Sequence, residues 1–173
     1  NTNVLNMLDL AGIPLYSKDR ADLAPLIVAG GPCACNPEPL ADFFDMFNIG
    51  EGEEMLVEIG KLYIQMKNDG SYTKADFLHM AAKNIPGVYV PSLYDISYNE
   101  DGTIKAYTPV YDDIPTKIIK RIVEDLDNAY WPTKMIVPST EIVHDRANLE
   151  LFRGCIRGCR FCQAGFSCRP VRR

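Results

Sequence analysis

The chain has 173 residues, of which 47% are hydrophobic, which suits one globular domain or a small domain with an extension. Its formal net charge is −5, and no run approaches the roughly 18 apolar residues of a membrane-spanning helix, so we expect no membrane partner. The six cysteines are unevenly clustered and no signal peptide is evident. We therefore expect reduced thiols and a soluble, cytoplasmic protein.

The first part of the chain is predicted to be an α/β unit built on a parallel sheet. Its expected elements, in chain order, are a helix over 4–10 ended by Gly12, a strand over 25–30, a helix opened by Asn36–Pro39, a strand over 46–49 and a helix over 54–67. Short continuous apolar runs are typical of parallel strands covered on both faces. Apolar side chains at helical spacing predict that the last helix is amphipathic.

Glycines follow both predicted strands, and this order of elements resembles the second half of a cobalamin-binding Rossmann-like domain. The resemblance implies contacts to the corrin ring and its nucleotide tail from Gly30, Gly31, Gly50, Glu51, Gly52 and Glu53. The sequence contains no Asp-x-His-x-x-Gly motif, which such domains use when histidine ligates cobalt. The alternative is that the glycines only form tight turns, while the glutamates favour the first turn of a helix.

The middle of the chain is predicted to connect two domains. Its expected elements are helices over 73–83 and 117–127, an extended stretch over 88–94, and a hairpin whose strands 96–98 and 104–107 flank a turn at 99–102. His144, Asp145 and Arg146 then place three ionisable groups together. They could contact a substrate, but a surface ion pair is the interpretation we favour, because exposed pairs are common.

A cysteine-rich loop near the end of the chain carries the strongest chemical signal. Cys155, Cys159 and Cys162 have a C-x3-C-x2-C spacing, which lets three thiolates converge on one centre from a single loop. Iron–sulfur clusters are usually held by four thiolates, so three would leave one iron open to another ligand. Gly158 precedes the middle cysteine, where we expect unusual backbone angles or a close approach.

This loop resembles the cluster loop of the radical S-adenosylmethionine (SAM) enzymes. The resemblance implies that Cys155, Cys159 and Cys162 hold a 4Fe–4S cluster and that SAM binds the fourth iron. One electron from the cluster would then cleave SAM to a 5′-deoxyadenosyl radical, and Phe161 would flank the SAM adenine. In that superfamily the loop follows the first strand of a partial (β/α) barrel, and residues 148–153 alternate polar and apolar as a strand does.

Two other interpretations of the loop remain open. Four thiolates, with Cys168 as the fourth, could form a closed zinc site. A metal-free α/β binding module would need none of these thiols. Cys33 and Cys35 lie far upstream of the loop and are expected to be packed thiols at a turn.

The carboxyl-terminal segment is strongly basic. Residues 151–173 contain six arginines and no acid, whereas the rest of the chain has twelve basic and twenty-three acidic residues. A basic end on an acidic body makes RNA a possible partner. We favour a local role, in which the arginines offset the cluster thiolates and the SAM carboxylate, because no aromatic ladder for base stacking accompanies them.

Over its full length the chain resembles a group of cobalamin-type radical SAM proteins described as uncharacterised Fe–S oxidoreductases. The motifs that carry this resemblance lie at 36–39, 50–53, 87–91, 144–146 and 153–165. It implies an oxidoreductase or transferase, with methyl or methylthio transfer as one reaction class and the substrate unknown. The expected domains are 1–72, the second half of the cobalamin-binding-type domain, 73–146, a connecting segment, and 147–173, the start of the radical SAM domain. We expect a fragment that is inactive alone, with the remainder of the parent chain as its partner, because a barrel needs well over a hundred further residues by comparison with ordinary barrels.

Overall fold

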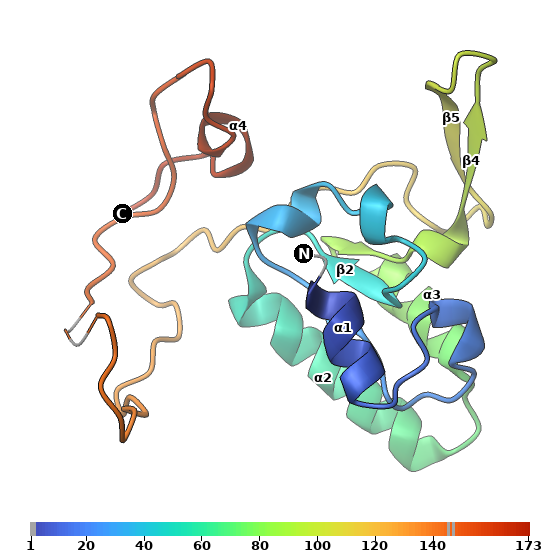
Figure 1. The fold of residues 1–173 in the computed structure, drawn as a ribbon, viewed down its shortest axis with the longest axis horizontal. Helices are drawn as coiled ribbons and strands as arrows, with labels where there is room; N and C mark the ends of the chain where they lie inside the picture. Colours follow the sequence, from blue (N-terminus) through green and yellow to red (C-terminus); the bar gives the residue numbers. More distant parts are fainter. Residues whose placement is uncertain (1–2, 145, 147) are drawn as a thin grey trace. The chain divides into compact units, whose positions relative to one another are not determined.

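The computed structural model describes residues 3–144, 146 and 148–173 and divides into two compact units (Figure 1). Unit 1 comprises Asn1–Ile122 and unit 2 comprises Val123–Arg173. Each unit is described by itself. No helix in the described part of the chain is both long and apolar enough to cross a bilayer. The domain boundaries expected after residues 72 and 146 stay predictions.

A small mixed sheet lies at the centre of unit 1. Its strands β1 (Val28–Ala29), β2 (Met46–Asn48) and β3 (Val88–Tyr89) lie in that order. β1 and β2 are parallel, as predicted, with Val28 opposite Met46. β3 is antiparallel to β2, so the prediction of a parallel sheet is wrong for this strand, which was expected to be linker. The chain returns to the sheet through Gly87. Its φ is 90°, a backbone angle that residues with a side chain rarely adopt.

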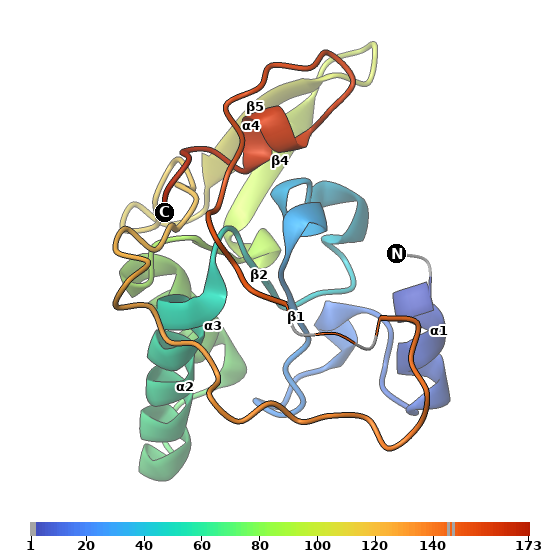
Figure 2. The ribbon, with the colours of Figure 1, turned by 90° about the vertical axis from the view of Figure 1, so that its left-hand side faces the viewer.

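Three helices accompany the sheet in unit 1, and all three were predicted. They are α1 (Asn3–Leu10), α2 (Gly52–Asp69) and α3 (Lys74–Asn84). Thr73 and Asp76 form a reciprocal capping box at the start of α3. α2 and α3 run side by side, and the strands lie between this pair and α1 in Figure 2. The helix expected after Asn36 is not an α-helix. A 3-10 helix over Glu38–Leu40 lies there instead.

The core of unit 1 forms where the sheet meets α2 and α3. Its largest fully buried side chains include Phe47, Phe77, Met46, Met55 and Val88. Burying a side chain of this kind contributes about 1.5–3 kcal/mol. The rings of Phe77 and Tyr63, from α3 and α2, meet edge to face with centroids 5.8 Å apart. This core fixes the sheet against the two helices.

The predicted hairpin is confirmed and the helix predicted beyond it is wrong. Strands β4 (Tyr94–Tyr98) and β5 (Ile104–Pro109) pair antiparallel. Residues 117–127 contain no helix. Arg121 instead pairs in parallel with Gly50, because its N–H donates to Ile49 O (2.9 Å) and its carbonyl accepts from Glu51 N (3.0 Å). At Arg121, main-chain pairing with the residues that follow β2 therefore replaces the hydrogen bonds that a helix would make.

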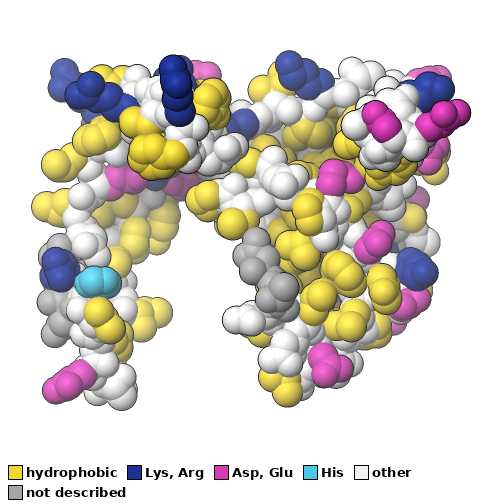
Figure 3. Space-filling model, turned by 45° about the horizontal axis from the view of Figure 1, so that its top comes forward, with side chains coloured by type: hydrophobic (Ala, Val, Ile, Leu, Met, Phe, Trp, Pro, Cys, Tyr) yellow, Lys and Arg dark blue, Asp and Glu magenta, His cyan; other side chains and the backbone are white. Residues whose placement is uncertain are grey.

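The described residues of unit 2 are mostly irregular and include one short helix, α4 (Ala164–Ser167). The strand predicted over 148–153, as the first of a barrel, is not formed: Arg153 alone of these residues pairs, with Arg172. Asp145 lies outside the described residues, while His144 and Arg146 are exposed with Nδ1 and Nη2 3.4 Å apart. Figure 3 shows unit 2, the left-hand column, with hydrophobic side chains open to solvent along it and Lys and Arg side chains gathered at its upper end.

Candidate metal centre

The three cysteines of the predicted cluster loop are free thiols in unit 2. Cys155 and Cys162 are half-buried and Cys159 is exposed. The turn between them closes through a hydrogen bond from Cys162 N to Cys159 O (3.1 Å). No disulfide competes for any of the three sulfurs, because all six cysteines of the chain are free.

The sulfur of Cys155 has a defined main-chain neighbour. The N–H of Arg157 donates to Cys155 Sγ over 3.4 Å. Hydrogen bonds to cluster sulfurs are one of the protein's means of setting a cluster's reduction potential. Cys155 therefore already has an N–H donor beside its sulfur, as the sulfur of a cluster ligand can have.

The unusual backbone angle and the close approach lie at Gly154 and not at Gly158, where they were expected. Gly154 has a φ of +97°, and a β-carbon there would lie 2.7 Å from the carbonyl oxygen of Cys168. Gly158 has no positive φ, and a β-carbon there would meet nothing within 4 Å. The tight approach thus falls at the base of the loop, before its first cysteine.

The donors fit an iron–sulfur cluster by their chemistry. Free thiols are the ligand type that such clusters take, and three of them on one loop would leave the fourth iron open to another ligand. Within the described residues, however, no three Cys, His, Asp or Glu side chains are arranged as a ready-made metal site. Binding would therefore require the three thiols to turn inward together. Phe161, predicted to flank SAM, is 93% exposed, and Cys168 is also exposed.

The predicted cobalamin contacts lie in unit 1, after β1 and β2. Gly50 has a φ of +120°, and a β-carbon there would lie 2.6 Å from the main-chain nitrogen of Arg121. Its close approach is therefore to the chain's own backbone. Glu51 precedes α2, while Gly52 and Glu53 begin it. Gly30 and Gly31 lie beyond β1, where a β-carbon on Gly31 would meet nothing within 4 Å. Corrin contact by these residues stays a prediction.

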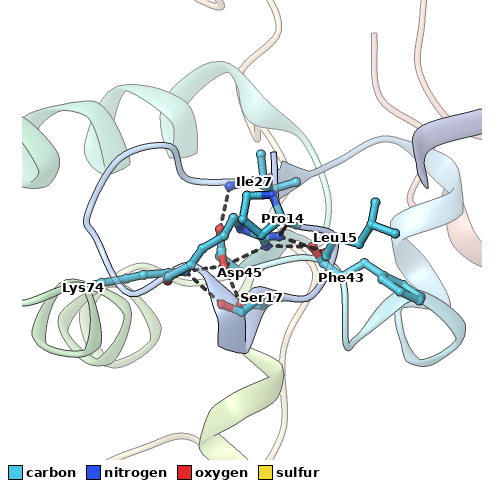
Figure 4. Close-up of polar contacts among 8 residues, drawn as sticks. Pro14, Leu15, Ser17, Ile27, Phe43, Asp45 and Lys74 are labelled. Carbon is cyan, nitrogen blue, oxygen red and sulfur yellow. Dashed lines mark hydrogen bonds and ion pairs between the residues drawn. The ribbon is translucent and has the colours of Figure 1, made fainter. Parts of the chain in front are cut away.

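Figure 4 shows a buried ionic cluster in unit 1. The sequence analysis did not predict it. Asp45, which directly precedes β2, is fully buried and bonds Arg20 (3.0 Å) and Lys74 (2.7 Å). The hydroxyl of Ser17 and the N–H of Ile27 also donate to its carboxylate. Burial would raise the pKa of Asp45, but the hydrogen bonds from Ile27, Lys74 and Ser17 outweigh it and hold that pKa below its ordinary value.

This cluster ties three parts of the chain together. Arg20 also donates to the carbonyls of Pro14, Leu15 and Phe43, while Lys74 reaches the carbonyl of Arg20. The two cations are thus committed to Asp45 and to main-chain oxygens. One sequence signal could have indicated the cluster: an aspartate placed between apolar residues at the start of a buried strand.

An open groove of about 1160 Å³ is lined in part by residues of this cluster. Its lining includes five tyrosines, Tyr16, Tyr89, Tyr94, Tyr98 and Tyr111, together with Arg20, Asp45 and Lys74. Because Arg20 and Lys74 are already bonded, they offer little to an anionic ligand. The groove therefore has room for a ligand but no chemistry that identifies one.

Comparison with known proteins shows the family through the first part of the chain. A family model described as radical SAM proteins, N-terminal, matches residues 1–91, more than half of the chain. An uncharacterized protein of Methanocaldococcus jannaschii, MJ0966, is 30% identical over 141 residues. That match covers 80% of this chain but only 23% of the relative. No solved structure gives a significant match. Since the family model covers the larger part of the sequence, the chain belongs to the radical SAM proteins, of which unit 1 carries the N-terminal region.

Proposed function

We propose that this chain provides the N-terminal region and the cluster loop of a radical SAM enzyme. The observation that carries the proposal is the combination of the family match at residues 1–91 with three free thiols on the loop at 155–162. The family implies a 4Fe–4S cluster and SAM. We assign the cluster ligands to Cys155, Cys159 and Cys162.

The cluster, when bound, supplies the electron for reductive cleavage of SAM. The chain's own residues have simpler roles. The three thiolates hold the metal, and the N–H of Arg157 supports the sulfur of Cys155. Phe161, which is open to solvent, offers a ring face on which an adenine can stack. The arginines of the segment 151–173 offer partners for the carboxylate of SAM.

The finer assignments belong to the intact parent enzyme and rest on resemblance. Methyl or methylthio transfer is the reaction class we propose, on a substrate that can include RNA. The remainder of the parent chain would complete the SAM site. Cobalamin is a weaker part of the proposal, because the glycine with the tightest surroundings, Gly50, is explained by its pairing with Arg121.

Anaerobic reconstitution with iron and sulfide tests the ligand assignment. We expect about four irons per chain, with the absorbance and low-temperature EPR of a 4Fe–4S cluster after reduction. Replacement of Cys155, Cys159 and Cys162 by serine should abolish the bound iron. The chain offers a matched control, because serine at Cys33, Cys35 and Cys168 removes equally many thiols and should leave the iron in place.

Each competing interpretation has its own signature in this experiment. One zinc per chain, lost when Cys168 is replaced, would overturn the proposal in favour of a zinc module. No bound metal in the unsubstituted chain, with unchanged stability in both triple variants, would indicate a metal-free α/β binding module. A change in the EPR spectrum on adding SAM would extend the support from the cluster to the SAM site.

A further inference from the structure

The chain that follows the cysteines folds back onto the start of the loop. Arg153 and Arg172 exchange both main-chain hydrogen bonds, each 2.9 Å long, and form an antiparallel pair. The loop that carries the three cysteines is thereby closed at its base. Gly154 stands directly inside this pair, and its positive φ lets the backbone pass against the carbonyls of Cys168 and Pro170.

The side chain of Arg172 adds a second attachment at the same place. Its guanidinium Nη1 donates to the carbonyl oxygen of Val123, at the start of unit 2. One residue therefore joins the base of the loop to a segment far away in sequence. A guanidinium suits this task because its donors are fixed in a plane and it stays charged at every relevant pH.

A third contact acts within the loop, beside the first cysteine. The guanidinium of Arg169 donates to the carbonyl oxygen of Arg157 (3.3 Å), and Gly165 packs so closely on this carbonyl that a β-carbon would lie 2.9 Å from it. The N–H of the same residue, Arg157, donates to Cys155 Sγ. The residue that supports the cysteine sulfur is thus held in place by the returning chain.

We propose that Gly154, Arg169 and Arg172 are positioning residues that hold the loop of Cys155, Cys159 and Cys162 closed before metal binds. The inference rests on the proposed function, since it concerns the reception of the cluster by this loop. Arg169 and Arg172 thus have a structural role, because their guanidinium groups bond main-chain carbonyl oxygens, in addition to any charge that they supply. The closed base limits the number of conformations open to the loop before metal binds. Less conformational entropy is therefore lost when the three thiols turn inward to bind the cluster.

Hydrogen exchange on the metal-free chain tests the closure directly. The amides of Arg153 and Arg172 should exchange at least about tenfold faster in Arg172→Ala and in Gly154→Ala than in the unsubstituted chain. Arg172→Lys, which keeps a cationic donor, should restore most of the protection. Arg173→Ala is the matched control, because Arg173 is exposed and makes no hydrogen bond or ion pair among the residues that the structure describes. The core amides of Phe47 and Phe77 in unit 1 report whether each variant is folded.

Iron uptake by the same variants then tests positioning. We expect Arg172→Ala, Gly154→Ala and Arg169→Ala to retain less than about half of the iron bound by Arg173→Ala after reconstitution and desalting. Unchanged exchange at Arg153 and Arg172 would overturn the closure. Faster exchange with full iron retention would overturn the positioning role while leaving the cluster assignment intact. Failure of the unsubstituted chain to take up iron would instead overturn the proposed function, and the positioning role with it.

Discussion

Arg121 pairs through its main chain with both neighbours of Gly50, and this relationship explains a glycine that otherwise suggests a ligand. Its N–H donates to Ile49 O and its carbonyl accepts from Glu51 N, with distances of 2.9 and 3.0 Å. Its side chain also bonds Glu54 (2.7 Å) and Glu58 (3.0 Å) on α2. The loop between β2 and α2 is therefore covered by the chain's own backbone.

Gly50→Ala should destabilise unit 1. A β-carbon would lie 2.6 Å from the nitrogen of Arg121, and the φ of +120° disfavours any side chain. Strain of this kind costs about 1–3 kcal/mol, so urea unfolding should show a free energy of unfolding lower by at least that amount. Gly60→Ala is the matched control, because Gly60 lies inside α2 in open space. Alanine there should stabilise by about 0.5–1 kcal/mol, and equal effects of the two changes would contradict the pairing.

The sequence predicted those parts of the fold whose signals are local. The capping residues of α3, the apolar stripe of α2 and the turn at 99–102 each act within a few positions of the elements that they specify. The segment 117–127 has an equally good helical pattern and still forms no helix. Arg121 within this segment pairs instead with Gly50, some seventy residues upstream, and a periodic pattern carries no information about such a partner.

The same distinction applies to the candidate site. Cysteine spacing indicated the donors that we propose, because the three residues lie on one short loop. It did not indicate Gly154 or Arg172, whose roles come from contacts made when the chain returns on itself. The prediction of unusual backbone angles or a close approach at Gly158 was wrong for this reason. Asp45 and its two cations, joined across more than fifty residues of sequence, were likewise visible only in the structure.

Asp45→Asn should be among the most destabilising changes of a polar residue in unit 1. It would leave Arg20 and Lys74 buried without their shared anion, and breaking a buried pair in this way costs about 3–5 kcal/mol. Asp42→Asn is the control, since Asp42 is exposed three residues away and should change the free energy of unfolding by no more than about 0.5 kcal/mol. Chemical denaturation of both variants measures the difference, and similar midpoints would show that the cluster is not a stabilising element.

The stability of unit 1 should fall in acid partly through Asp113. Lys83 (2.9 Å) and then His79 (3.1 Å) lower the pKa of its carboxyl from 3.8 to about 2. Because the folded-state pKa is the lower one, the unfolded chain binds more protons in this window. The contribution of Asp113 is therefore fully present above about pH 4 and is lost as the pH falls towards 2.

The difference between the unsubstituted chain and Asp113→Asn isolates this contribution, because the pKa values of Asp45, Asp76, Asp101 and Asp125 are lowered as well. The free energies of unfolding should differ near neutral pH and converge as the pH approaches 2. A difference that grows on acidification would have the wrong sign for this assignment.

Thr73→Ala should weaken α3 at its first turn. The hydroxyl of Thr73 accepts from the N–H of Asp76 (3.2 Å), and the Asp76 carboxylate accepts from the N–H of Thr73 (2.8 Å). Loss of an N-cap side chain costs about 0.5–2 kcal/mol, and serine should restore most of it because it keeps the hydroxyl. Ser71→Ala, two residues earlier, removes only an exposed contact to Asp69 and serves as the control. Exchange of the amides in the first turn of α3 should quicken in Thr73→Ala alone. The same acceleration in Ser71→Ala would mean that the whole α2–α3 connection, and not the cap, holds this end of the helix.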